Sequence, residues 1–301
     1  MTTTETPTDA YLSPLTAAQV DRLVTLALST CRRLGFDLHY EAGALFSPGP
    51  GPILGLTNLA RAIAHQDPDD WPQFIDIHFI DLLRRLDQGV PDPPDNPAAQ
   101  LIQRLVPRTS LPPNWVASRP DVLPGLLSVP ATQQDQTVTM YLDPTDLGLT
   151  WSAAEALGLA NLRRRPDHLD LLEEDDVQIA RLTGDSFTAS RALVLDTVLH
   201  ETLNLPTLPS AVLAAVPSRD LLLIHIVKDL SVLPALGHLL HLTARAHTQA
   251  PGPLSPDIHL VTFTPTGHPT WHPATTHSTP TTLALSPQLT TLVSSLPAEA
   301  D

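Results

Sequence analysis

Apolar residues recur every three to four positions along several stretches of the chain, the spacing that places them on one face of a helix. In residues 16–34, for example, Val20, Leu23, Ala27 and Cys31 share such a face. A small buried hydrophobe is the interpretation that this pattern favours for Cys31. The same criterion predicts six helices: residues 16–34, 57–65, 70–89, 152–165, 187–203 and 231–247.

Shorter runs alternate between apolar and polar residues or are continuously apolar, and these patterns predict strands. Residues 221–227 are apolar at nearly every position, so we expect a central strand covered on both faces. The short connection 217–220 predicts an antiparallel hairpin with the preceding run. The expected strands are residues 36–40, 44–46, 53–56, 100–106, 137–142, 176–182, 212–216, 221–227, 258–264 and 269–274.

This succession of elements predicts an α+β fold of two α/β subdomains, with mixed, mostly antiparallel sheets and helices packed on them. A run of proline and aspartate at residues 90–97 is typical of an extended, solvated linker. The predicted organisation is a disordered tail at 1–13, an N-terminal domain at 14–89, the linker, a C-terminal domain at 98–275 and a mostly disordered tail at 276–301.

Charge and composition argue against several classes of protein, among them nucleic-acid-binding, disulfide-linked and membrane proteins. The chain has 301 residues and a net charge of −15, from 32 acidic and 17 basic residues, so we expect no nucleic-acid partner. A single cysteine excludes an intrachain disulfide and fits a reducing compartment. The sequence shows neither an apolar run long enough for a membrane span nor a signal peptide. We therefore expect a cytoplasmic protein without membrane association.

Two short motifs point toward hydrolases, and each lacks its partners. The Gly-Asp-Ser run at 184–186 resembles the block that carries the nucleophile of SGNH esterases, which makes Ser186 a weak catalytic candidate. Those enzymes also need an Asp-x-x-His sequence, and this chain has none. His200 and Glu201 begin a zinc motif whose second histidine is replaced by Asn204.

Other candidate chemistry is sparse. Glycine-rich nucleotide loops are absent, so no cofactor is expected. His238 and His241 lie one helical turn apart and would need a further ligand to hold a metal, so no metal site is predicted. His225 lies within the most apolar strand, which makes it the histidine with the strongest expectation of a shifted pKa.

Four short motifs in the second half occur in an order that resembles a family of bacterial cytosolic proteins described as a domain of unknown function. They are Val106-Pro107-Arg108, Asn161-Leu162-Arg163, Ala189-Ser190-Arg191 and Pro217-x-x-Asp220, and the likeness extends over residues 101–263. The resemblance implies an αβ fold, a cytosolic location and no established activity. It also supplies six candidate binding positions: Arg108, Asn161, Arg163, Ser190, Arg191 and Asp220.

The leading hypothesis is a non-catalytic cytosolic binding or regulatory protein of unknown function. It follows from the missing catalytic partners, cofactor loops and metal ligands, and it implies another protein as the partner, bound through a sheet edge or a groove. The alternative is a small hydrolase, either serine-type at Ser186 or metal-dependent. The sequence favours a protein that is not an enzyme over an enzyme. It does not indicate the oligomeric state.

Overall fold

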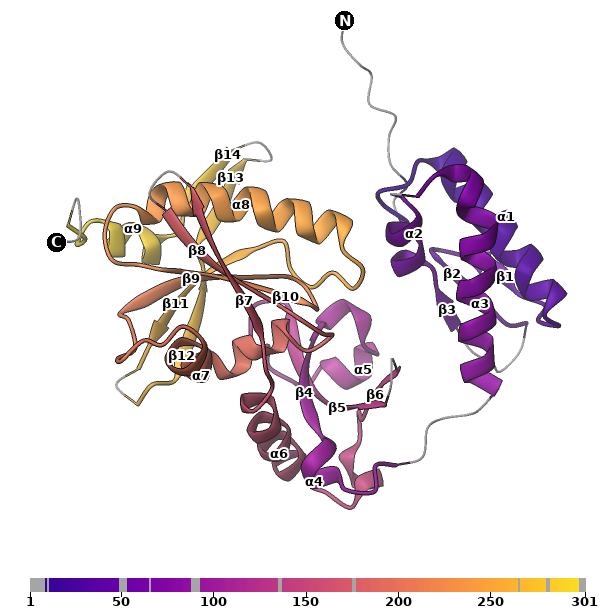
Figure 1. The fold of residues 1–301 in the computed structure, drawn as a ribbon, viewed down its shortest axis with the longest axis horizontal. Helices are drawn as coiled ribbons and strands as arrows, with labels where there is room; N and C mark the ends of the chain where they lie inside the picture. The colour runs from indigo at the N-terminus through magenta and orange to yellow at the C-terminus, as the bar shows by residue number, and fades with distance from the viewer. Residues whose placement is uncertain are drawn as a thin grey trace, which may run out of the picture. The chain divides into compact units, whose positions relative to one another are not determined.

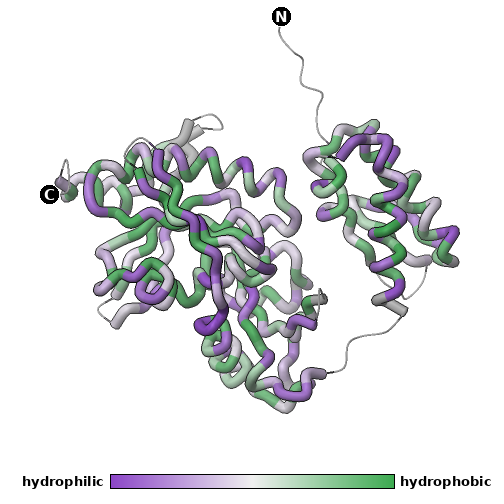
Figure 2. The backbone as a smooth tube through the Cα atoms, viewed as in Figure 1, coloured by the Kyte–Doolittle hydropathy of each residue, from purple (hydrophilic) through white to green (hydrophobic). Residues whose placement is uncertain are grey.

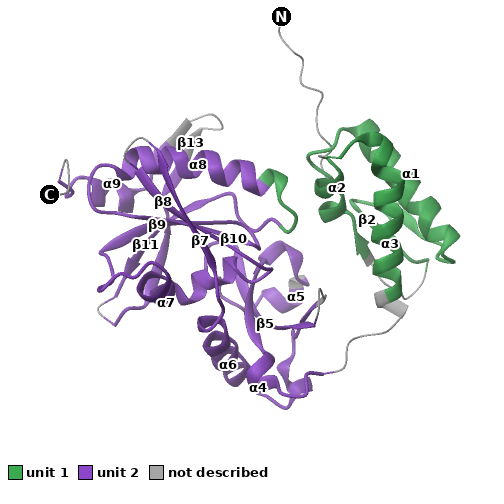
Figure 3. Ribbon diagram, viewed as in Figure 1, with its two compact units in different colours: residues 1–92, 248–252 green, residues 93–247, 253–301 purple. Residues whose placement is uncertain are grey.

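The computed structural model describes residues 9, 11–48, 53–64, 66–87, 93–134, 137–174, 177–264, 266–279 and 282–297. They form two compact units, one of residues 1–92 with 248–252 and one of residues 93–247 with 253–301 (Figure 3). The division after residue 92 falls within the proline-rich run at 90–97. Gly89 and residues 90–92 of that run lie outside the described residues.

Unit 1 is a three-stranded antiparallel sheet with helices packed on it. Its first helix begins at Thr16, whose side chain accepts a hydrogen bond from the Gln19 amide while the Gln19 side chain accepts one from the Thr16 amide. Polar and apolar residues intermix along both long helices, as expected for helices with one buried face (Figure 2). The elements are α1 (Ala17–Arg33), β1 (His39–Glu41), β2 (Ala44–Phe46), β3 (Ile53–Gly55), α2 (Thr57–Ile63), η1 (Pro68–Asp70) and α3 (Trp71–Asp87).

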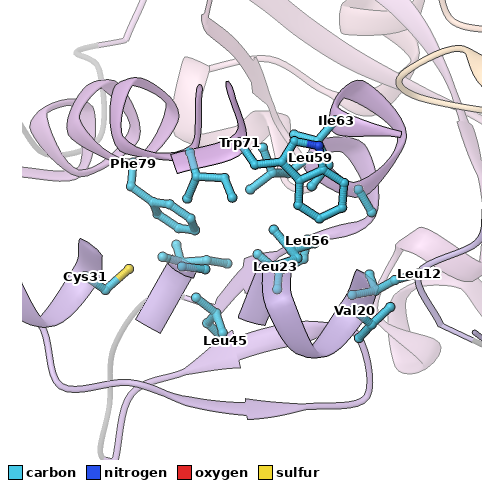
Figure 4. Packing of buried hydrophobic residues seen from close by; sticks show 14 of the residues in the cluster. Leu12, Val20, Leu23, Cys31, Leu45, Leu56, Leu59, Ile63, Trp71 and Phe79 are labelled. Carbon is cyan, nitrogen blue, oxygen red and sulfur yellow. The ribbon is translucent and has the colours of Figure 1, made fainter. Parts of the chain in front are cut away.

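The core of unit 1 brings the large side chains of α3 onto the apolar face of α1 (Figure 4). Trp71 and Phe79 are almost fully buried in this core, together with Leu23. Cys31 is fully buried, and burial raises the pKa of its thiol to about 11. The expected role of Cys31 as a buried hydrophobe is therefore confirmed. Leu12, within the predicted disordered tail, is also fully buried, whereas residues 1–8 and 10 lie outside the described residues.

Unit 2 contains a small antiparallel sheet in the order β4-β5-β6. Its central strand was not expected from the sequence, because Pro130 interrupts the run and prolines are uncommon in central strands. Pro130 is nevertheless paired with Gln103 of the neighbouring strand. The elements of this region are α4 (Pro97–Gln100), β4 (Ile102–Pro107), η2 (Arg108–Ser110), α5 (Pro113–Val116), β5 (Leu126–Gln134), β6 (Thr137–Met140), η3 (Pro144–Leu147) and α6 (Trp151–Arg163).

The larger sheet of unit 2 has the order β12-β11-β9-β10-β8-β7. Every strand pair in the described part of the chain is antiparallel, which confirms the α+β class. Its strands are β7 (His168–Glu174), β8 (Val177–Thr183), β9 (Ala211–Ser218), β10 (Leu221–Ile226), β11 (Ile258–Phe263) and β12 (Pro269–Pro273). The remaining elements are η4 (Ala189–Val194), α7 (Leu195–Thr197), η5 (Val198–Thr202), α8 (Val232–Gln249), β13 (Thr275–Thr279), β14 (Thr282–Leu285) and α9 (Pro287–Val293).

Helical segments cover both faces of this sheet, with α8 and α7 on opposite sides (Figure 1). All eight residues of β9 are buried, and the four central residues of β10 are buried as well. The expectation of a central strand at 221–227 is confirmed. Among the described residues no helix, including the 18-residue α8, is long and apolar enough to cross a membrane.

Three segments of unit 2 differ from the elements expected from the sequence. The helix at 187–203 is a succession of 3-10, α and π turns, in which the Leu203 amide donates to the Val198 carbonyl at 3.0 Å. The edge strand β7 was missed because polar and half-exposed residues dominate it. The segment after residue 276 is ordered where it is described, since Ser286 caps α9 and Leu289 is fully buried against the face that α8 covers.

The close approach of α6 to β4 yields a test of the packing. A Cβ at Gly158 would lie 2.9 Å from the backbone nitrogen of Gln103, which is too close for a carbon atom. Gly158→Ala should therefore push α6 away from β4. Such overpacking costs about 1–3 kcal/mol. At Gly237 of α8 nothing lies within 4 Å of an added Cβ, so Gly237→Ala should stabilise the protein by up to about 1 kcal/mol. Urea unfolding of both variants measures the difference, and equal effects would contradict this packing.

Candidate functional site

Arg108, the first of the predicted site residues, holds the chain between β4 and β5. Its guanidinium pairs with Asp121, with Nε 2.7 Å from a carboxylate oxygen. The same group donates to the carbonyls of Val116 at 2.7 Å and Arg119 at 2.5 Å. Through these three acceptors Arg108 stabilises the loop between β4 and β5.

Asn161 and Arg163 both project from α6 toward neighbouring elements. The Asn161 amide donates to the carbonyls of Ala98 at 2.8 Å and Leu101 at 2.9 Å, which ties α6 to the chain around α4. Arg163 forms an exposed ion pair with Asp196 at 2.9 Å. These contacts stabilise the positions of α4, α6 and α7.

Ser190 and Arg191 are buried at the start of η4. The Ser190 hydroxyl accepts a hydrogen bond from the Leu105 amide at 2.9 Å. The Arg191 and Asp167 side chains are 3% and 2% exposed and form an ion pair at 2.8 Å. Burial raises the pKa of Asp167, and the Arg191 charge opposes that rise.

Asp220 and Ser186 lie in turns. The Asp220 carboxylate accepts a hydrogen bond from the Ser218 hydroxyl at 2.6 Å. Among the described residues no hydrogen bond joins Ser186 to a histidine, and the neighbouring Asp185 pairs with Arg165. Arg191 also donates to the Leu162 carbonyl at 2.6 Å, so the structure brings it to the end of α6 that carries Asn161 and Arg163. The contacts of Arg108 and Asp220 lie within their own loops.

A cavity of about 480 Å³ opens where β10 separates from β8. The ladder between these strands ends at Ile224 and Ala180, although β10 continues along β9 to Ile226. Beyond that point β8 pairs with β7 alone. Apolar side chains of β7 and β8 and polar residues from three segments line the opening, among them Leu171, Gln178, Asn204, His225, Asp229 and Ser231.

His225 occupies the place where the ladder ends. Its Nδ1 lies 2.9 Å from the Gln178 carbonyl, which only accepts, so Nδ1 carries the hydrogen. In the neutral ring Nε2 is then an acceptor, and this atom is buried without a partner among the described residues. Burial lowers the pKa of His225, while the bond to Gln178 acts in the opposite direction. The ring therefore offers an acceptor beside the cavity.

A π turn forms another wall of the cavity. Turns of this type are rare and occur often at functional sites. The turn Val198–Thr202 is followed by Asn204, which has a positive φ of 53° and ends the helical segment. The ring of His200 fixes this end, because its Nδ1 lies 2.8 Å from the Leu205 carbonyl. His200 thus stabilises the backbone at the cavity through its contact with Leu205.

Strand β7 is the outermost strand of the six-stranded sheet beside this cavity. Within the described residues it pairs with β8 alone, so its other edge presents unpaired backbone groups. Leu171 is 52% exposed on this strand. Polar and apolar residues alternate over 168–171, a weak signal for β7, but Leu172 ends the alternation after four residues.

His259 on β11 is a buried titratable residue that the sequence analysis did not single out. It is fully buried, and neither ring nitrogen has a hydrogen-bond partner in the described part of the chain. Trp271 packs edge-on against its ring at a centroid distance of 5.8 Å. Burial lowers the pKa of His259 to about 4. Its place in an apolar strand, like that of His225, was the available signal.

Metal binding finds no support in the described residues, which contain no group of three or more potential ligands with suitable geometry. His238 instead lies 3.4 Å from Glu174. Comparisons with protein-family models, with curated proteins and with solved structures find no match for this chain. The resemblance to a family of bacterial cytosolic proteins thus remains a prediction.

The buried ion pair predicts a large energetic coupling. Arg191→Leu should destabilise the protein by about 3–5 kcal/mol, because it leaves the Asp167 carboxylate buried without its cation. The double variant Arg191→Leu/Asp167→Leu should recover much of that loss. Arg163→Leu, which breaks an exposed pair, serves as the control and should cost about 1 kcal/mol or less. Additive effects of the two buried substitutions in urea unfolding would contradict this coupling.

His259 predicts a loss of stability in acid. The pKa of His259 is about 4 in the folded chain and near 6.5 when the ring is exposed. Below pH 6.5 the unfolded state therefore binds a proton at this ring, whereas the folded state remains unprotonated there until the pH approaches 4. Between these values the folded state loses on the order of 3 kcal/mol. His259→Leu should remove this part of the pH dependence. The exposed His241→Leu should leave it unchanged, and equal slopes in all three proteins would contradict the assignment.

Proposed function

We propose that the chain is a non-catalytic cytoplasmic binding protein that recognises an extended segment of another protein along β7. The proposal depends on the edge of β7 that has no strand partner among the described residues, beside the cavity of about 480 Å³. An extended segment adds to such an edge through backbone hydrogen bonds, and pockets next to the edge select its side chains. Both parts of that recognition mode are present here.

The chemistry of this surface defines the expected partner. Leu171 offers apolar area, so a side chain of the segment can cover it and enter the cavity. The buried acceptor Nε2 of His225 favours a side chain that donates a hydrogen bond. Glu173 and Glu174 are exposed on β7, and the chain has a net charge of −15. We therefore expect a basic segment in which apolar and polar residues alternate.

Binding accounts for these features better than hydrolysis. A serine hydrolase needs a base within reach of its nucleophile. Ser186 is half-buried and no base lies in hydrogen-bond contact with it in the described residues, and Ser231 beside the cavity is bonded through its amide to Asp229. The hydrolase alternative would be supported instead if a fluorophosphonate probe labelled Ser186.

A peptide library tests the proposal. Basic peptides with alternating apolar residues should be enriched on the immobilised protein, and hydrogen exchange should show protection of β7 amides when they bind. Leu171→Arg should weaken the best peptide by about tenfold or more, since it removes apolar contact area and adds a like charge. Leu233→Arg alters an exposed leucine on α8 and is the control. Unchanged affinity of Leu171→Arg, or protection confined to other elements, would refute the proposal.

A further inference from the structure

Arg104 is a half-buried cation that has no counterion in the described part of the chain. It lies on β4 with its guanidinium 5.8 Å from the centroid of the Phe187 ring. Its Nε is buried, and no hydrogen bond or ion pair of this side chain occurs within the described residues. A charge removed from water in this way is costly unless a partner compensates it.

The β9–β10 turn that carries Arg219 and the strand that carries Arg104 are hydrogen-bonded to consecutive residues of η4. The Ala189 amide donates to the Arg219 carbonyl at 3.1 Å, and the Leu105 amide next to Arg104 donates to the Ser190 hydroxyl at 2.9 Å. No carboxylate pairs with the Arg219 side chain among the described residues. The adjacent Asp220 accepts from the Ser218 hydroxyl instead.

The two arginines act on one another as like charges. Burial and, as a smaller cause, the positive charge of Arg219 together lower the pKa of Arg104 to about 10. This arrangement occurs in a chain that has 32 acidic and 17 basic residues, so acidic residues are plentiful. None of the acidic residues that the structure describes pairs with Arg104.

Two other partly buried arginines of unit 2 have partners that compensate their charge. Arg165 contacts the same Phe187 ring at 5.1 Å and pairs with Asp185. Arg119 also has an unpaired Nε, but its guanidinium lies 3.6 Å and 4.1 Å from the ring centroids of Trp151 and Trp115. Stacking between two rings compensates Arg119. Arg104 has one distant ring and a second cation.

We propose that Arg104 and Arg219 bind the phosphoryl group of a small phosphate monoester. Guanidinium groups present planar pairs of donors that match phosphoryl oxygens, and two of them balance a dianion. The net charge of −15 disfavours a polyanion such as nucleic acid, whereas a compact dianion experiences mainly the two nearby cations. This site is independent of the β7 edge.

Calorimetric titration of the full chain with phenyl phosphate tests the site, with inorganic phosphate and succinate as comparison ligands. Both phosphates should bind at millimolar or lower concentration, and succinate should bind more weakly because its two charges are farther apart. Arg104→Gln and Arg219→Gln should each weaken phosphate binding about tenfold, the loss expected for a charge-assisted contact. Arg84→Gln removes an equal charge from unit 1 and should bind as the unaltered protein does.

Arg104→Lys separates charge from geometry, since it keeps the charge and loses the paired donors. Its affinity should fall between those of the unaltered protein and Arg104→Gln. Should Arg104→Gln fail to fold, Arg219→Gln in the half-buried turn tests the site alone. Absence of phosphate binding, equal binding of succinate, or unchanged affinity in folded Arg219→Gln would each overturn the proposal.

Discussion

Burial of the β9–β10 hairpin on both faces is the constraint on which the rest of unit 2 depends. All eight residues of β9 are buried, and apolar positions alternate between the side covered by α8 and the side covered by η4, α7 and η5. Because successive residues of a strand point to opposite faces, a shift in register would exchange the two layers. The hairpin therefore fixes which helical segment lies on which side.

The start of η4 joins this sheet to the smaller one. Ala189, Ser190 and Arg191 bond in turn to the hairpin turn, to β4 and to the end of α6. Two of the predicted binding positions thus form a structural junction within the core. The two proposed ligand sites lie around it, at the separation of β8 from β10 and at Arg104 on β4 with Arg219 in the hairpin turn.

The pattern of apolar and polar residues predicted helices and strands well where an element buries one face or all of its residues. The helices α1, α3 and α8 and the strands β9, β10 and β11 follow periodicity that is visible in the chain. Patterns failed for β5, where Pro130 is tolerated inside a sheet, and for β7, whose exposed edge leaves little apolar signal. The π turn was missed because a shift from i+4 to i+5 hydrogen bonding has no marker in residue spacing.

The sequence by itself determined the α+β class, the separation near residue 92, the buried nature of Cys31 and the absence of a complete catalytic motif. These properties follow from local periodicity and residue counts. Only the tertiary structure decided that His225 ends a ladder beside a cavity, that Asp167 neutralises Arg191, and that Arg104 has Arg219 as a neighbour. Such relations join residues far apart in the chain, and their distances are set by how strands pair and layers pack.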